Sequence, residues 1–235
     1  EHEKETALHP RVVVVLEENS QPNLVETFVG APNESYLNNA VSEISLDRAA
    51  RLEHTRLQEE GMSAHHLAQL YVEQKRDSTY RSHLFDFGAS VGRTGINVRL
   101  LEQGAFCYLG GLYMIGGKQH ADVYTKIEHV APHCQSQEIY KGILAGSATS
   151  VFNGYVLVQK EAQKTDSSQQ NRNLILSKKA TANTRPQLEI YADDVKGAHG
   201  GTVGQLDENA VFYLGARGVG EDEARKMLTL AFAAD

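Results

Sequence analysis

Short strand-like segments recur along the first 205 residues, and this recurrence is the feature that most constrains the fold. In several of them apolar and polar residues alternate, as in Ala50–Leu57, where Leu52, His54 and Arg56 fall on one face. The segments follow one another roughly every 14 to 18 residues, separated by Gly, Asn, Asp, Ser or Pro. The predicted strands are Arg11–Glu17, Leu24–Val29, Ala50–Gln58, Gln69–Glu73, Thr79–Phe87, Ile96–Leu101, Asp122–Val130, Gln137–Leu144, Tyr155–Gln159, Asn173–Leu176 and Gln187–Ala192.

The pattern predicts an all-β domain over residues 1–205. No amphipathic helix of about ten residues separates the segments, which argues against a βαβ fold. A sandwich, a barrel and a β-solenoid all fit the pattern. Gly-rich corners and few two-residue hairpin turns favour the solenoid, although no strict sequence repeat is visible. The polar stretch Lys160–Arg172 is predicted to be a corner or an exposed loop.

The pattern changes near Leu206, and residues 206–235 are predicted to form a short C-terminal helical segment. Asp207 can cap a helix over Glu208–Ala216, and Gly218 can end it. A second helix follows, with acidic residues in its first turn and one apolar stripe. The stripe consists of Ala224, Met227, Leu228, Ala231 and Phe232. From the pattern alone, this stripe packs against the β-domain or forms a docking face, and packing is favoured.

The composition is that of an ordinary soluble globular protein and excludes several classes of function. The formal net charge of -7 argues against nucleic acid and against anionic membranes. The longest purely apolar run, Val12–Leu16, is far shorter than the ~20 residues of a membrane span. Two cysteines, Cys107 and Cys134, are too few for a disulfide framework. We therefore expect a cytoplasmic protein, and the start at Glu1 suggests a piece of a longer product.

Two glycine clusters imitate phosphate-binding loops. Gly88–Thr94 has three residues between its glycines where the P-loop has four, and Gly111–Gln119 lacks the Ser or Thr after its lysine. Neither cluster opens a recognisable helix. Solenoid corners that need a positive φ explain these glycines better than nucleotide binding does.

The histidines offer weaker candidates for chemistry. His129, His133 and Cys134 have the side chains of a soft metal site, but a surface or corner role is preferred because nothing shows that they converge. His65 and His66 begin a strand or end a loop with no partner in view.

The segment Asp193–Thr202 places two carboxylates, a lysine and His199 on a short strand and turn just before the helices. Asp and His side chains together can bind iron or another divalent ion. The preferred alternative is that the two aspartates shape a turn and the glycines permit close packing.

Several motifs over the last 130 residues occur in the order and spacing of one known family. They are Gly111–Tyr113, Gln119–Asp122, Tyr140–Gly142, Gln163–Asp166, Gln169–Ser177, Pro186–Lys196, His199–Asp207 and Phe212–Val219. On these residues the chain resembles the SufB/SufD family of iron–sulfur cluster assembly proteins. Within it the chain is similar to the SufD type, since no cysteine follows Cys134 and Ala198–Gly201 stands where SufB-type chains carry a Glu-His-Glu-Ala-like stretch.

The resemblance implies a right-handed parallel β-helix and a non-catalytic scaffold subunit in a complex with a SufB-type subunit and a SufC-type ATPase. It implies that His199 lies at the interface with SufB and handles iron, as a metal ligand, without a tightly bound cofactor in the isolated chain. Iron or a nascent cluster would lie at that interface. SufD-type chains commonly carry Cys where this chain has Gly197. The residues expected to dock SufC are Phe212, Tyr213, Leu214, Met227, Leu228 and Phe232.

An uncovered final coil is open to edge pairing, so the isolated chain is expected to form a homodimer. The alternative function is a β-helix carbohydrate-active enzyme, which needs a groove of converging acidic residues that the sequence does not show. A membrane permease is excluded for this segment by the missing apolar span.

Overall fold

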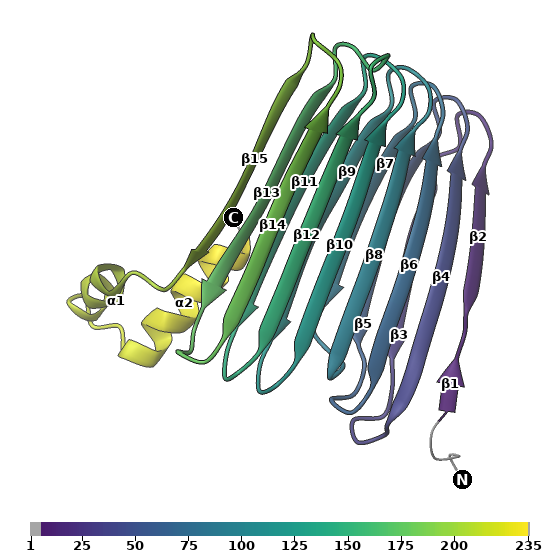
Figure 1. Ribbon diagram of the computed structural model, residues 1–235. Coiled ribbons are helices and arrows are strands. Elements are labelled where there is room, and N and C mark those ends of the chain that lie inside the picture. The colour runs from purple at the N-terminus through teal and green to yellow at the C-terminus, as the bar shows by residue number, and fades with distance from the viewer. Residues whose placement is uncertain (1–5, 235) are drawn as a thin grey trace.

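A computed structural model describes residues 6–234 as a parallel β-solenoid followed by two helices (Figure 1). Every strand pair in this part of the chain is parallel, and paired residues lie 26 to 32 positions apart, as in Leu67↔Arg93 and Thr149↔Thr181. One turn of the solenoid therefore takes about that length of chain and places one strand in each of two sheets. This confirms the prediction of a mainly β solenoid.

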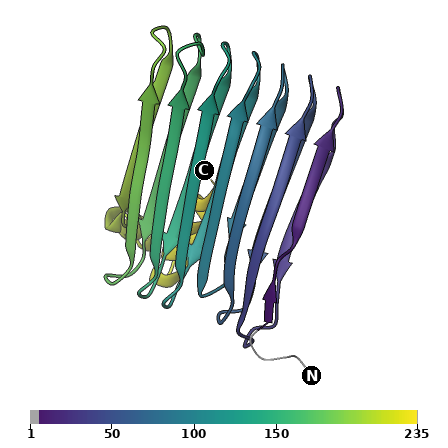
Figure 2. The ribbon, with the colours of Figure 1, turned by 45° about the vertical axis from the view of Figure 1, so that its right-hand side comes forward.

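The two sheets face each other and stack their strands in chain order, from the N-terminal turn to the C-terminal turn (Figure 2). The first sheet consists of β1 (Thr6–Leu8), β2 (Arg11–Leu16), β4 (Tyr36–Leu46), β6 (His65–Gln74), β8 (Val91–Leu100), β10 (His120–His129), β12 (Thr149–Val158) and β14 (Thr181–Ile190). The second consists of β3 (Asn23–Val29), β5 (Arg51–Glu59), β7 (Thr79–Asp86), β9 (Phe106–Ile115), β11 (Gln135–Leu144), β13 (Asp166–Ile175) and β15 (Lys196–Gly204).

The core lies between the two sheets and is filled by every second residue of each strand. In β10, for example, Val123, Thr125 and Ile127 are fully buried while Tyr124 and Lys126 between them are partly exposed. The largest apolar rings pack near the middle, where Tyr140 and Phe152 have their ring centroids 5.4 Å apart. Each such side chain contributes about 1.5–3 kcal/mol by leaving water.

Strands β4 and β9 were not predicted. In β4 the interior positions Ala40 and Ser42 are small and are preceded by two asparagines, so its β propensity is weak. In β9, Gly111 belongs to a glycine cluster that is predicted to form a corner, but it lies inside the strand. A Cβ at Gly111 would be 2.6 Å from Cε1 of Tyr140, so glycine makes room for that ring.

The prediction of a corner or loop over residues 160–172 is right only for the first half. The chain turns up to Thr165, and β13 begins at Asp166. Its polar residues Ser167, Gln169 and Asn171 alternate into the interior and are buried. A polar strand that points inward cannot be told from a loop by its composition.

One row of corners repeats the same backbone turn in successive coils, with a residue of positive φ in each. The residues of this corner row are Asn19, Ala49, Asp77, Gly104, His133 and Lys164. Their amides link the coils, as in Asn19 N–H to the Arg48 carbonyl at 3.0 Å and Ala49 N–H to the Arg76 carbonyl at 2.9 Å. The glycine-corner hypothesis is therefore only partly right, because five of the six residues are not glycine, and in Gly88–Thr94 the positive φ belongs to Ala89.

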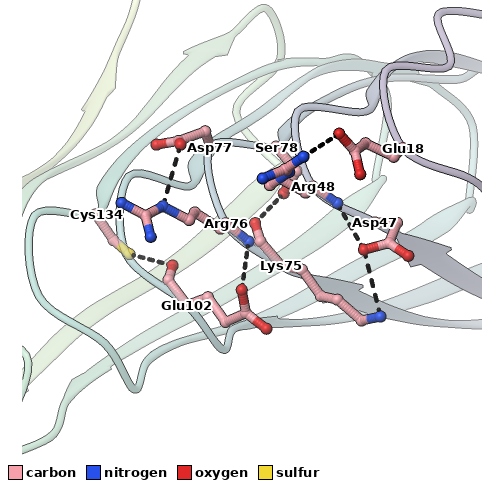
Figure 3. A network of polar contacts seen from close by, with 9 residues as sticks. All are labelled: Glu18, Asp47, Arg48, Lys75, Arg76, Asp77, Ser78, Glu102 and Cys134. Atoms are coloured by element: carbon pink, nitrogen blue, oxygen red, sulfur yellow. Dashed lines mark hydrogen bonds and ion pairs between the residues drawn. The ribbon is translucent and has the colours of Figure 1, made fainter.

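The same corner row carries a surface network of charged groups (Figure 3). Arg48 pairs with Glu18, Lys75 Nζ lies 3.4 Å from Asp47 Oδ1, and the Arg76 N–H donates to Glu102 Oε2 at 3.1 Å. These side chains are largely exposed, so water and salt screen the pairs and each adds little to stability. The network joins coils that are already held by the backbone.

Both predicted helices are present. α1 (Glu208–Gly215) begins after Asp207, whose side chain accepts a hydrogen bond from the Asn209 N–H, and Gly218 has a φ of 86° just beyond it. α2 (Glu221–Ala234) has three acidic residues in its first turn. The last strand ends at Gly204, so the expected boundary at residues 205 and 206 lies between strand and helix; the division into two domains stays a prediction.

Candidate functional site

The C-terminal end of the solenoid leaves β15 uncovered. β15 pairs with β13 alone within residues 6–234, and all nine of its residues are exposed. The Lys196 N–H donates to the Thr165 carbonyl, so in a parallel pair the even-numbered amides of β15 face β13. The odd-numbered amides, including that of His199, lie on the open edge.

His199 lies in the middle of β15 and faces the solenoid interior. It is in register with Gln169, which is fully buried, and in-register neighbours of parallel strands share a face. The neighbouring odd-numbered residues of β15, Gly197 and Gly201, also face the interior. A Cβ at Gly197 would lie 3.2 Å from Ile190 Cδ1, and one at Gly201 would lie 2.9 Å from Thr184 Cγ2, both on the facing strand β14. The imidazole is therefore at the mouth of the core, where solvent reaches it.

Two buried polar residues lie beneath His199. Gln169 Nε2 donates to Glu138 Oε2 at 2.5 Å, and neither side chain is exposed. Burial raises the pKa of the Glu138 carboxyl to about 7, although the side chains of Thr125 and Gln169 oppose the rise. Sequence reasoning missed both residues. Glu138 lies on a predicted strand and Gln169 in a polar stretch, so both were visible in the sequence. Only the register between neighbouring coils shows that these two side chains lie under His199.

The two aspartates of the predicted site do not join His199. Asp193 and Asp194 are exposed in the corner before β15, where Asp194 pairs with Lys164 and its N–H donates to Gln163 Oε1 at 2.9 Å. In the part of the chain that the structure describes, no three His, Cys, Asp or Glu side chains are grouped to hold a metal ion. The preferred interpretation of a turn is thus the better one for these carboxylates.

The other histidine candidates have structural partners that the sequence did not reveal. His129 is buried, not on a surface or corner, and its Nε2 lies 2.9 Å from Ser136 Oγ; burial lowers its pKa to about 4. His133 belongs to the corner row, and Cys134 Sγ contacts the Glu102 carbonyl at 3.3 Å. His66 is buried with its Nδ1 2.6 Å from Glu60 Oε2.

The predicted docking residues divide between two environments. Phe212 and Tyr213 on α1 are 78% and 56% exposed, and Met227 on α2 is 45% exposed. Phe232 instead packs on the outer face of β11, where Lys141 Nζ donates to its carbonyl at 2.9 Å and lies 5.6 Å from its ring centroid. Leu214 and Leu228 are half-buried. The helices therefore carry both an inner contact and an outer apolar surface.

A groove of about 630 Å³ separates α2 from the last turns of the solenoid. Leu176, Leu206 and Leu230 contribute its apolar walls, and Glu208 and Arg225 form an ion pair at 2.8 Å beside it. The helical segment is thus only partly attached to the solenoid.

Comparison with known proteins identifies the family. The family model described as the SUF system FeS cluster assembly, SufBD core domain, matches residues 1–232. The chain belongs to the SufBD family. This confirms the resemblance on which the site residues were chosen, and with it a family role in iron–sulfur cluster assembly.

The curated relatives agree. The chain is 36% identical to an iron–sulfur cluster assembly SufBD family protein of Synechocystis, over 97% of this chain and 52% of the relative. It is 34% identical to the iron–sulfur cluster assembly protein SufD of Escherichia coli, over 99% of this chain and 55% of the relative. A chloroplastic protein of Arabidopsis thaliana is 35% identical over 97% of this chain and 48% of its own length. The chain thus spans about half the length of these relatives, and the SufD-type resemblance is confirmed.

Proposed function

We propose that this SufBD-family chain is the core of a SufD-type scaffold subunit, which is non-catalytic and pairs with a SufB-type subunit at its open final turn. The observation that carries the proposal is the uncovered strand β15 with His199 at its centre, in a chain 34% identical to the SufD protein of Escherichia coli. An open strand edge supplies backbone donors and acceptors that a partner strand can satisfy. The matched relatives are assembly proteins and give no support to the carbohydrate-active alternative.

His199 is the group proposed to handle iron, which is the cargo of the assembly reaction. A neutral imidazole is a good iron ligand, and the interior side of β15 brings it to the seam between the two subunits. The lone histidine offers an incomplete coordination sphere, so further ligands would come from the partner. Gly197 presents no thiol beside it.

A pull-down of the full-length protein with SufB-type and SufC-type partners, with and without ATP, tests the pairing. We expect the three to co-purify, and His199→Ala to lose cluster formation while the complex stays intact. His65→Ala, which removes an exposed histidine on β6, is the matched control and is expected to assemble clusters normally. Normal assembly by the His199 variant would contradict the role of that residue but leave the scaffold role standing.

The helices α1 and α2 are proposed to dock a SufC-type ATPase. Phe212, Tyr213 and Met227 form the exposed apolar surface that such a partner would cover. We expect Phe212→Asp with Met227→Asp to lose SufC while retaining SufB. Tyr71→Asp, at a 48% exposed position on β6, should lose neither. Retention of SufC by the double variant would show that this surface is not the docking site.

No helix within residues 6–234 is long and apolar enough to cross a membrane. The cytoplasmic location stays a prediction, and one relative is named as chloroplastic.

A further inference from the structure

A column of polar side chains runs from the mouth of the solenoid into its core. Glu138, Gln169 and His199 are successive in-register partners on β11, β13 and β15. Neighbouring strands lie about 4.8 Å apart, so the column has one polar group at each step. The facing strand β12 leaves room for it, because a Cβ at Gly154 would lie 2.2 Å from Gln169 Nε2.

The hydrogen bond between Gln169 and Glu138 orients the amide. An ionised carboxylate only accepts hydrogen bonds, so it must receive the amide nitrogen, as it does at 2.5 Å. The amide oxygen Oε1 is buried and accepts no hydrogen bond from any residue in the described part of the chain. The next side chain in the column is His199.

We infer that Gln169 and Glu138 are positioning residues for His199: Glu138 holds the Gln169 amide so that its unpaired oxygen is presented to a ring N–H of His199. An imidazole that donates one N–H to a carbonyl has a fixed tautomer, and its other nitrogen is a more basic ligand. This inference deepens the proposed function. It rests on the proposed function only for the purpose of the orientation, which is iron handling by His199. The orientation itself is a property of this chain alone.

Glu138 is the only acidic side chain in the column. Cys107 on β9 and Tyr140 on β11 are titratable groups near it, and burial, with the Glu138 charge as a second cause, raises the pKa of both. No cationic side chain among residues 6–234 contributes to the pKa of Glu138, which lies at about 7. Below that pH the protonated carboxyl can donate to the amide oxygen, which frees the amide to turn. The orienting effect should therefore weaken as the pH falls through about 7.

The rate of carbethoxylation of His199 by diethyl pyrocarbonate, measured by mass spectrometry on the 235-residue chain, tests the inference. The reagent attacks the free nitrogen, so its rate reports how basic and how well presented that nitrogen is. We expect Gln169→Met to lower the rate at pH 7.5 by about threefold or more, relative to exposed His65 in the same molecule. Glu189→Gln makes the charge change of Glu138→Gln on the outer face of β14, away from the column, so it is the control and should leave the rate unchanged.

A swapped pair separates positioning from packing. In the double variant Glu138→Gln with Gln169→Glu, the amide at 138 donates to the carboxylate at 169, which keeps an acceptor for His199. We expect it to restore the wild-type rate, whereas Glu138→Gln alone should lower the rate and flatten its pH profile near 7. Equal rates in wild type, Gln169→Met and Glu138→Gln would overturn the inference, as would failure of a folded swap variant to rescue.

The proposed function can fail separately. If His199→Ala assembles clusters normally while the modification rates behave as expected, Gln169 still orients His199, but not for cluster chemistry.

Discussion

Asp86 on β7 is a buried carboxyl group with no matching cation in hydrogen-bond contact. Neither of its oxygens has a hydrogen-bond partner within residues 6–234. Burial, together with the nearby charge of Glu60, raises its pKa to about 7, while Arg56 opposes the rise. Such a group costs stability when it is ionised.

The resulting pH dependence has a definite sign. Because the pKa of Asp86 is higher in the folded state than its ordinary value of 3.8, the folded state binds more protons than the unfolded state between about pH 4 and 7. The free energy of unfolding should therefore fall as the pH rises through that window, by at most about 1.4 kcal/mol per pH unit for this group. Glu138 adds a slope of the same sign.

We expect Asp86→Asn to flatten this slope and to stabilise the protein at pH 8. Urea unfolding at pH 5, 6, 7 and 8 measures it. Asp166→Asn, at an exposed position on β13, should keep the wild-type slope. An unchanged slope in Asp86→Asn would show that Asp86 is not the group responsible.

Gly197 stands where the resemblance to SufD-type chains implied a cysteine. A Cβ there would lie 3.2 Å from Ile190 Cδ1, which requires a shift of a few tenths of an ångström in a side chain at the open end. Gly197→Cys should therefore fold with a stability within about 1 kcal/mol of wild type. Its thiol would share the inward face of β15 with His199.

Thiol labelling of Gly197→Cys in the native state gives the measurement. Cys107 and Cys134 are buried, so rapid labelling of one additional thiol is the expected result. Loss of the cooperative unfolding transition in Gly197→Cys would contradict the expected stability. It would show that the facing strand β14 cannot move to make room for the new side chain.

At the scale of elements, the strands depend on interior glycines that admit the side chains of neighbouring coils. Gly142 on β11 is in register with Tyr113 on β9 and Asn173 on β13. The Tyr113 hydroxyl donates to Asn173 Oδ1 at 2.6 Å, so the two side chains meet over the glycine. A Cβ at Gly142 would lie only 2.1 Å from Tyr113 Cε2.

Gly142→Ala should consequently destabilise the protein by several kcal/mol, on the order of 3, because a buried hydrogen bond and a packed ring are both displaced. Thermal unfolding followed by circular dichroism measures the change. Gly116→Ala is the matched control, since a Cβ there would meet nothing within 4 Å, and its melting temperature should stay near that of wild type. Equal behaviour of the two variants would rule out the packing argument.

At the scale of the whole molecule, the solenoid within residues 6–234 ends in the edge strand β15, and association of the chain should depend on that edge. Odd-numbered residues of β15 direct their amides away from β13, so a proline there removes a donor from the open edge without breaking the solenoid ladder. Val203, which is 51% exposed, is a suitable position. We expect the isolated chain to form a homodimer through this edge.

We expect Val203→Pro to convert that homodimer to a monomer. Light scattering at several concentrations measures the mass. Thr202→Pro, one residue away, removes an amide that faces β13 and should instead lower stability. A monomeric wild-type chain at high concentration would contradict the homodimer, and a dimeric Val203→Pro variant would place the contact elsewhere.

The mainly β fold, both C-terminal helices and the family could be predicted from the sequence alone. Period-two alternation, the absence of intervening helices and the spacing of motifs such as His199–Asp207 are local properties that survive without coordinates. The sequence also pointed to His199, but through resemblance and not through chemistry visible in the chain.

The tertiary structure decided which residues lie together. Coil lengths vary from 26 to 32 residues, so the register that stacks Glu138, Gln169 and His199 depends on every corner between them. Non-glycine residues such as Ala49 adopt a positive φ because hydrogen bonds between coils hold them there. Polar side chains such as Asn171 are buried because their hydrogen-bond partners come from other coils. None of these effects is local, which is why composition and periodicity could not reveal them.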